Sequence, residues 1–218
     1  MPASDAGGPG RRTRLAGLYV IVGGADPVAQ ADAALAGGAR ALQVRMKAAP
    51  AGAVLDVARR VVALAAGRAL VIVNDRADLA LLAGADGVHL GDDDLPVAEA
   101  RRLVGPELLV GRTSRTLAEA RAAIAAGADH VGFGPVFASR TKVLPVGPRG
   151  LTALREVAAG LGAPVVAIGG IGLSNVAAVA RHGACAAAVI SDVLGATDPA
   201  GRARAVVLAF RQAREEDA

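Results

Sequence analysis

Short runs of apolar residues, many of them β-branched, recur along the chain and alternate with alanine-rich stretches. The runs lie at residues 18–22, 41–44, 70–73, 87–90, 108–110, 130–133, 164–168 and 186–190. Between them, apolar residues recur at helical spacing, as at Leu117, Ala120 and Ile124. The pattern therefore predicts a strict alternation of strand and helix along the whole chain.

Glycines mark where helices should return to strands. A Gly-Ala pair precedes an apolar run at residues 38–39, 84–85, 127–128 and 183–184. A glycine in the left-handed conformation is a common way to end a helix, because it has no Cβ to clash. These pairs predict four helix ends independently of the strand assignments.

The strand pattern favours one fold over its nearest rival. Nearly continuous apolar strands indicate a parallel sheet that is covered on its faces. Eight strand–helix units in 218 residues favour a single-domain (β/α)8 TIM barrel over residues 15–218, and a doubly wound sheet is the alternative. No GxGxxG motif follows the first run, so a dinucleotide site has no support. In a barrel, the residues just after each strand form the functional end.

Composition narrows the possible partners. Hydrophobic residues make up 53% of the chain and charged residues 20%, which excludes a wholly disordered protein. Aromatic residues are only 2%, with no Trp, so stacking of nucleic-acid bases is not expected. The net charge is +4, but part of it lies in the first 14 residues and no basic run follows. We therefore expect no nucleic-acid partner.

Cysteine content and the chain ends bear on location. The single cysteine, Cys185, cannot form an intramolecular disulfide, which fits a cytoplasmic protein. Residues 1–14 have no apolar core of a signal peptide and are expected to form a mobile N-terminal tail. The uncharged stretch 157–180 contains Pro164 and several glycines, so it predicts a helix end, strand, loop and helix start instead of a membrane span. No membrane partner is expected, and a homo-oligomer is left open.

Cationic residues are placed where a barrel would bind an anion. Of the 24 basic residues only Lys47 and Lys142 are lysines, and both follow predicted strands. A lysine ammonium suits phosphate oxygens, although a solvated surface lysine is the plain alternative. Gln43, Arg45 and Lys47 alternate along an extended segment and should point to one side. They therefore predict a site for an anionic ligand, with an exposed strand edge as the alternative.

Carboxylates follow the next two predicted strands. Asp75 comes after Asn74 at the end of the third run, and Asp92, Asp93 and Asp94 follow the fourth. Asp75 has two interpretations of equal weight, as the cap of the next helix or as a ligand. A carboxylate of the triplet could share a Mg²⁺ ion with Asp75, although an acidic triplet alone usually marks a solvated turn.

Further loops have the composition of phosphate sites. The segment 132–142 combines glycines, two hydroxyls and Lys142, while Gly169-Gly170 and Ile190-Ser191 follow the last two strands. Tight turns explain these glycines equally well. The three histidines have no metal-binding spacing; His130 and His182 are expected to be structural, and His89 could face either side of its strand. No nucleophile motif is visible, and Cys185 is expected in the core.

Seven motifs in order resemble the thiamine-phosphate synthase family, also called thiamine phosphate pyrophosphorylase, from about Leu18 to the C-terminal helix. They are Leu18-Tyr19-Val20-Ile21, Gln43-Val44-Arg45-Met46-Lys47, Val73-Asn74-Asp75-Arg76, residues 85–91, residues 132–142, Val166-Ala167-Ile168-Gly169-Gly170-Ile171 and Ile190-Ser191. Each motif is weak alone, but the ordered set is specific.

The resemblance implies a Mg²⁺-dependent transferase of thiamine biosynthesis. The family condenses hydroxymethylpyrimidine diphosphate with hydroxyethylthiazole phosphate, which gives thiamine phosphate and pyrophosphate. Its partners are therefore phosphorylated small molecules, and its cofactor is Mg²⁺. Cationic groups and a metal stabilise the leaving diphosphate in such chemistry, and no protein nucleophile is needed.

The resemblance also assigns roles to positions of this chain. The catalytic positions would be Arg45, Lys47, Thr113 and Lys142. The pyrimidine diphosphate would contact Gln43, Val44, Arg45, Met46, Lys47, Asn74, Thr113 and Lys142. The metal ligands would be Asp75 and Asp94. The thiazole phosphate would contact Ser139, Arg140, Thr141, Gly170, Ile190 and Ser191.

Four positions depart from the family pattern. Thr113 stands in place of a serine and Arg115 in place of a histidine in the family's Gly-x-Ser-x-His segment. Met46 replaces an acidic residue, and Ser139 replaces a threonine. Two other functions compete with the synthase: a thiazole tautomerase-like enzyme on the same barrel, and a non-catalytic barrel that binds thiamine precursors.

Overall fold

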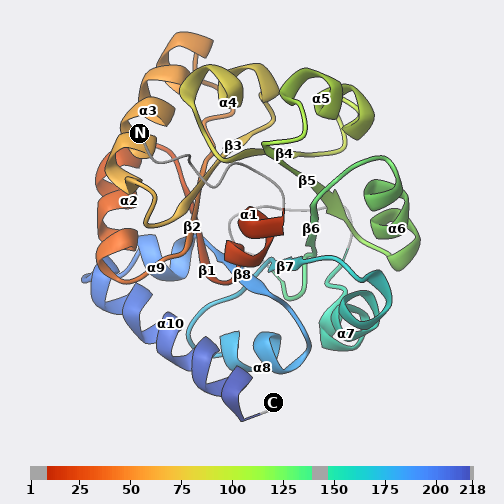
Figure 1. Ribbon diagram of the computed structural model, residues 1–218. Coiled ribbons are helices and arrows are strands. Elements are labelled where there is room, and N and C mark those ends of the chain that lie inside the picture. Colours follow the sequence, from red (N-terminus) through yellow and green to blue (C-terminus); the bar gives the residue numbers. More distant parts are fainter. Residues whose placement is uncertain (1–8, 139–146, 217–218) are drawn as a thin grey trace.

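Eight parallel strands form a closed barrel in chain order, with β1 paired to both β2 and β8 (Figure 1). The structure is a computed structural model that describes residues 9–138 and 147–216. The predicted (β/α)8 barrel is confirmed. The strands are β1 Gly17–Val22, β2 Ala41–Val44, β3 Leu70–Asn74, β4 Gly87–Leu90, β5 Leu109–Ser114, β6 His130–Phe133, β7 Val165–Ile168 and β8 Ala186–Val189.

Helices follow the strands and surround the barrel (Figure 1). Each of the four predicted returns to a strand holds a glycine with positive φ, at Gly38, Gly84, Gly127 and Gly183. The helices are α1 Pro9–Arg14, α2 Pro27–Ala36, α3 Ala51–Ala65, α4 Ala77–Ala83, α5 Val97–Val104, α6 Leu117–Ala125, α7 Gly150–Leu161, α8 Val176–Arg181, α9 Ser191–Leu194 and α10 Pro199–Glu215.

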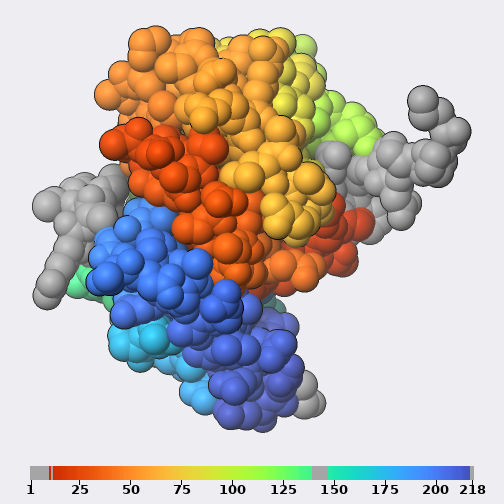
Figure 2. Space-filling model, turned by 90° about the vertical axis from the view of Figure 1, so that its left-hand side faces the viewer, coloured from red at the N-terminus to blue at the C-terminus, as the bar shows by residue number. Residues whose placement is uncertain are grey.

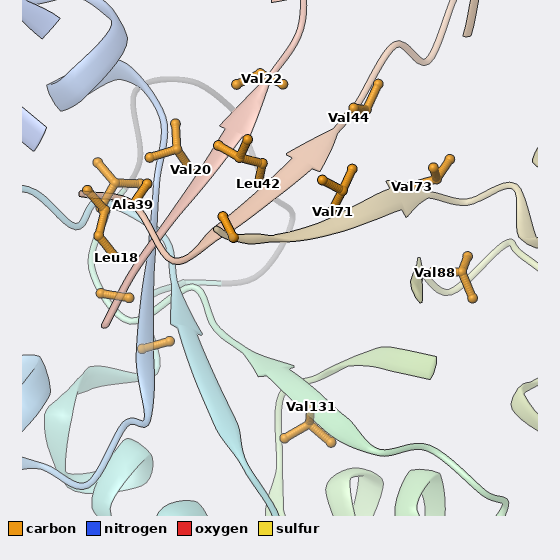
Figure 3. Packing of buried hydrophobic residues seen from close by; sticks show 14 of the residues in the cluster. Leu18, Val20, Val22, Ala39, Leu42, Val44, Val71, Val73, Val88 and Val131 are labelled. Atoms are coloured by element: carbon orange, nitrogen blue, oxygen red, sulfur yellow. The ribbon is translucent and has the colours of Figure 1, made fainter. Parts of the chain in front are cut away.

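Alternation along the strands creates two separate apolar cores. One set of side chains, including Leu18, Val20 and Leu42, points outward and packs under the helices (Figure 3). The other set, including Tyr19 and Ile72, fills the barrel interior. Both faces of the sheet are therefore buried, which is why the strands are nearly continuous apolar runs in the sequence.

Helix α1 lies across the middle of the ring of strands in Figure 1. It leads directly into β1, so it covers the amino-terminal end of the barrel, where Leu15 joins the interior core. Arg12 of this helix pairs with Asp129, the residue before β6. The expected tail over residues 1–14 thus differs from the structure at residues 9–14, which form a helix; residues 1–8 lie outside the described residues.

The first and last parts of the chain lie side by side. Figure 2 shows the orange surface near the N-terminus against the blue surface of the C-terminal helix. The contact is close, because a Cβ added at Gly37 would lie 2.4 Å from the Cβ of Ala203 on α10. Helix α10 therefore covers the seam where β8 meets β1.

The uncharged stretch 157–180 divides as the sequence predicts. It contains the end of α7, all of β7, a loop and the start of α8. Within residues 9–138 and 147–216, none of the helices is both long and apolar enough to cross a membrane.

Candidate active site at the carboxyl end of the barrel

A cavity of about 850 Å³ opens at the carboxyl ends of the strands and reaches into the barrel. It lies at the end opposite to α1. Nine of the residues that the sequence assigned to a site line this cavity. They are Gln43, Arg45, Lys47, Asn74, Asp75, Thr113, Gly170, Ile190 and Ser191.

The segment after β2 presents its polar side chains to the cavity. Gln43, Arg45 and Lys47 all line it, as their alternation predicts. Val44 is buried in the outer core, and Met46 packs against that core. A ligand contact by either of these two residues would therefore involve the backbone. The hypothesis of an outward-facing strand edge is wrong, because Gln43 is only 3% exposed and lies inside the barrel.

Asp75 has a backbone conformation that aims it into the site. Its φ is +66°, in the left-handed region, and its N–H donates to His89 O at 2.8 Å. The next helix, α4, takes Arg76 as its N-cap, so Asp75 is not the cap. Lys47 Nζ lies 3.6 Å from Asp75 Oδ2. Of the two interpretations of Asp75, the geometry favours a ligand.

Asp75 and Asp94 lie next to each other. Burial raises the pKa of Asp75, the hydrogen bond and negative charge of Asp94 raise it further, and Lys47 and Arg45 oppose this rise. Asp94 Oδ2 accepts a hydrogen bond from the backbone N–H of Gly91 at 2.6 Å, which fixes the second carboxylate. Two carboxylates that repel each other are a place where a cation would relieve the repulsion.

The donor set fits Mg²⁺ in particular. The described residues contain no group of three or more His, Cys, Asp or Glu side chains placed to hold a metal. Mg²⁺ is commonly held by one or two carboxylates, with water and substrate phosphates completing its octahedral coordination. Asp75 and Asp94 supply those two carboxylates, and the adjoining Lys47 and Arg45 suit a phosphate ligand.

Thr113 meets a histidine on the barrel wall. His89 Nε2 lies 3.1 Å from Thr113 Oγ1, and both residues line the cavity. Burial lowers the pKa of His89 to about 4 and that of the neighbouring His130 to about 3, so both rings are neutral at pH 7. The sequence left the direction of His89 open, and the structure turns it inward. His130 is buried beside it.

Arg115 also lines the cavity. From the sequence it stood out only as a departure from the family pattern. Its Nη2 donates to Asp92 Oδ2 at 2.5 Å, and Arg112 Nη2 lies 3.9 Å from Asp92 Oδ1. The three residues of the acidic triplet therefore have different surroundings. Asp92 forms ion pairs with the two arginines, Asp94 faces Asp75, and Asp93 is exposed.

The loops after β7 and β8 bring backbone close to the cavity. A Cβ at Gly170 would lie 2.3 Å from Ala138 O, so only glycine fits there, and its φ is +62°. Ser191 begins α9, and Asp192 beside it accepts from Leu173 N–H and pairs with Arg202. The sequence-predicted residues Ser139, Arg140, Thr141 and Lys142 lie outside the described residues.

Tyr19 and Asp192 are among the cavity-wall residues that sequence reasoning missed. Tyr19 is buried, and its hydroxyl accepts a hydrogen bond from Gln43 Nε2 at 2.9 Å; burial raises the pKa of this hydroxyl above its usual value. Its signal was available, since it is the single tyrosine of the chain and lies in an aliphatic strand. Asp192 had no such signal, because an acidic residue at a helix start is ordinary.

The fold and the cavity define a TIM-barrel protein with a pocket of cationic and acidic side chains at the carboxyl ends of its strands. A family model described as thiamine monophosphate synthase matches residues 18–193. The thiamine-phosphate synthase of Anaeromyxobacter dehalogenans (strain 2CP-C) is 74% identical over 98% of this chain and 97% of its own length. The chain belongs to the thiamine monophosphate synthase family, as the sequence motifs predicted.

Two further relatives agree. The thiamine-phosphate synthase of Myxococcus xanthus (strain DK1622) is 53% identical over 83% of this chain and 83% of its own length. The solved thiamine phosphate pyrophosphorylase from Pyrococcus furiosus superposes with a TM-score of 0.84 at 35% identity, covering 92% of this chain and 98% of that one.

Proposed function

We propose that this barrel is a thiamine-phosphate synthase that condenses hydroxymethylpyrimidine diphosphate with hydroxyethylthiazole phosphate in a Mg²⁺-dependent reaction. The single observation that carries the proposal is one cavity lined by two cationic side chains, Arg45 and Lys47, and by Asp75, with Asp94 next to Asp75 behind the lining. Family membership supplies the reaction, and the cavity holds the groups that such a reaction needs.

The chemistry breaks one bond and forms another. The C–O bond between the pyrimidine methylene and the diphosphate breaks, and both electrons leave with the diphosphate. The thiazole nitrogen then donates its lone pair to the same carbon, which forms the C–N bond of thiamine phosphate. Negative charge therefore grows on the leaving group, and positive groups fixed around it lower the barrier.

The chain's own residues serve this charge. Lys47 and Arg45 would bind the diphosphate oxygens, with Asp75 holding the Lys47 ammonium near the site at 3.6 Å. Lys142 would join them from the loop after β6, on the strength of the family motif. A Mg²⁺ ion held by Asp75 and Asp94 would supply further electrostatic stabilisation of the diphosphate. Gln43, Asn74 and Thr113 would orient the pyrimidine.

The opposite side of the cavity suits the thiazole phosphate. Gly170, Ile190 and Ser191 line it, and backbone N–H groups can approach a phosphate where side chains are small. Ser139, Arg140 and Thr141 are assigned to the same phosphate by the family motif. Two substrates bound from opposite walls would meet in the centre of the barrel mouth.

The first experiment mixes purified protein with both phosphorylated precursors, with and without Mg²⁺, and measures thiamine phosphate and pyrophosphate together. Equimolar products that require Mg²⁺ are the expected result. Isomerisation of a thiazole phosphate without condensation would favour the tautomerase-like enzyme. Binding of thiazole phosphate by a folded protein that makes no product would favour the non-catalytic barrel.

A carboxylate variant tests the metal assignment. Asp75→Asn should abolish Mg²⁺-dependent turnover, because it removes one of two carboxylates while keeping the side-chain shape. Asp93→Asn is the matched control, since Asp93 is exposed and belongs to the same acidic triplet as Asp94. Equal activity of both variants would refute the assignment of Asp75.

The cytoplasmic location belongs to the same proposal, and the oligomeric state is left to measurement. The location is supported by the biosynthetic role of the relatives and by the single cysteine. Fractionation of the producing cells, and light scattering of the purified protein, would test these two points.

A further inference from the structure

His89 is clamped between two glycines inside the barrel. His89 lies on β4 and pairs in register with Gly111 on β5, and Gly132 lies on the following strand, β6. A Cβ at Gly111 would lie 2.7 Å from His89 Nδ1, and a Cβ at Gly132 would lie 2.8 Å from His89 Cε1. No side chain except hydrogen fits at either position without moving the ring. The position of the imidazole is therefore set by the barrel.

One ring nitrogen of His89 has a hydrogen-bond partner among the described residues, and the other has none. Nε2 lies 3.1 Å from Thr113 Oγ1, whereas Nδ1 is buried and has no hydrogen-bond partner among the residues that the structure describes. A hydrogen on Nδ1 would be a buried donor without an acceptor, which is rarer and costlier than a buried acceptor without a donor. The hydrogen is thus assigned to Nε2, where it points at Thr113.

This tautomer fixes the role of the threonine hydroxyl. When Nε2–H donates to Thr113 Oγ1, the threonine hydrogen cannot point back at the ring and is left to donate elsewhere. Thr113 lines the cavity, so the hydroxyl can donate to a ligand there. The alternative tautomer would turn the threonine hydrogen toward His89 and leave only lone pairs for the ligand.

We propose that His89 is a positioning residue that makes Thr113 a hydrogen-bond donor to the substrate. Thr113 would then recognise an acceptor atom, such as a ring nitrogen or a phosphoester oxygen. This inference rests on the proposed function, because it treats the cavity as the site of turnover. It concerns the hydrogen bond of the His89 side chain with Thr113, whereas Asp75 bonds to the backbone carbonyl of His89.

A double-mutant cycle in kcat/KM tests this role. His89→Leu and Thr113→Val should each lower kcat/KM by about tenfold, the size expected for losing one hydrogen bond to substrate. The double variant should lose no more than Thr113→Val alone, because His89 acts only through that hydroxyl. Independent losses that multiply to about a hundredfold would overturn the proposal.

Two conservative variants separate positioning from packing. Glutamine can place its amide nitrogen near the position of Nε2, whereas asparagine reaches only the position of Nδ1. His89→Gln should therefore keep kcat/KM within about threefold of the wild type, and His89→Asn should behave like His89→Leu. Equal activity of the Gln and Asn variants would contradict the proposal. If His89→Leu does not fold, His89→Asn replaces it in the double-mutant cycle.

His130 provides the matched control. It is buried in the same barrel interior, its ring centroid lies 6.0 Å from that of His89, and it does not line the cavity. His130→Gln should leave kcat/KM unchanged in the folded protein. A loss equal to that of His89→Leu would mean that any disturbance of the interior lowers activity, which would overturn a specific role for His89.

The same double-mutant cycle, measured by ligand binding, distinguishes failure of the synthase proposal from failure of the positioning role of His89. Calorimetric titration of the four proteins with the pyrimidine diphosphate alone needs no turnover. If the wild type binds without making product, the synthase proposal fails, while coupling between His89 and Thr113 in Kd would still support the positioning role. Turnover in the wild type without coupling in kcat/KM or Kd would sustain the synthase and overturn the positioning role.

Discussion

Asp129 should stabilise the barrel without affecting catalysis. Its side chain is 7% exposed, pairs with Arg12 and Arg101, and accepts the backbone N–H of Val110 at 2.7 Å. Asp129→Asn keeps the shape but removes the charge that two arginines need. This residue lies at the amino-terminal end of the barrel, opposite the cavity. In TIM barrels, residues at this end contribute to stability, and the catalytic residues lie at the other end.

The two arginines set the expected magnitude. Removing one partner of a buried ion pair costs about 3–5 kcal/mol. Arg101 is 22% exposed and keeps carbonyl acceptors such as Leu108 O at 2.7 Å, which places the loss for Asp129→Asn near the lower end, at about 3 kcal/mol. Arg12 is 53% exposed, so Arg12→Ala should cost only about 1 kcal/mol through the ion pair.

Urea unfolding followed by circular dichroism measures these losses as free energies of unfolding. Asp56→Asn is the control, because its pair with Arg60 is exposed on both sides and should be worth almost nothing. kcat/KM of folded Asp129→Asn should equal that of the wild type. A loss of stability below about 1 kcal/mol, or a changed kcat/KM, would refute the reasoning.

Three other predictions concern the barrel interior and the site. Gly111→Ala should lower the free energy of unfolding by about 1–3 kcal/mol, since the added Cβ would lie 2.3 Å from His130 Nε2; urea unfolding measures this. Burial raises the pKa of the Cys185 thiol to about 12, so the native protein should not react with a thiol reagent at pH 8, whereas the urea-unfolded chain should react fully. The positive charge of Lys47 lowers the raised pKa of Asp75, so Lys47→Met should move the carboxyl titration of Asp75 to higher pH, as ¹³C NMR of the ligand-free protein would record.

Each of these has its own control. Gly52→Ala on α3 meets nothing within 4 Å and should be neutral or stabilising, so equal losses at Gly52 and Gly111 would argue against crowding. Fast native labelling of Cys185 would contradict the raised pKa of this half-buried thiol. A titration of Asp75 that stays in place or moves to lower pH in Lys47→Met would show that Lys47 does not act on this carboxyl.

The strands were predictable because burial on both faces leaves one clear pattern. β7 and β8 fall within one or two residues of their apolar runs. β5 was predicted to end at residue 110 but runs to Ser114. Its last residues, Arg112 to Ser114, are polar, and Thr113 among them lines the cavity, so an apolar pattern cannot detect them.

Site residues were predictable where residue type and the strand period were enough to place them. They were less predictable where contacts with other strands set the direction of a side chain. The alternation of Gln43, Arg45 and Lys47 placed all three correctly, because a strand period of two needs no tertiary information. The direction of His89 depends on glycines of neighbouring strands, which a single segment does not reveal. Helix α1 was missed because its support comes from the distant Asp129.

The chain's scarce aromatic residues give its cavity an optical label. Tyr19 is the single tyrosine, and the chain has no tryptophan. The near-ultraviolet absorption and the intrinsic fluorescence therefore arise mainly from one phenol, which stands in the cavity wall and is hydrogen-bonded to Gln43. A ligand that reaches Gln43 will change this signal directly, so occupancy of the pyrimidine side can be followed in the unmodified protein without dyes, tags or coupled enzymes.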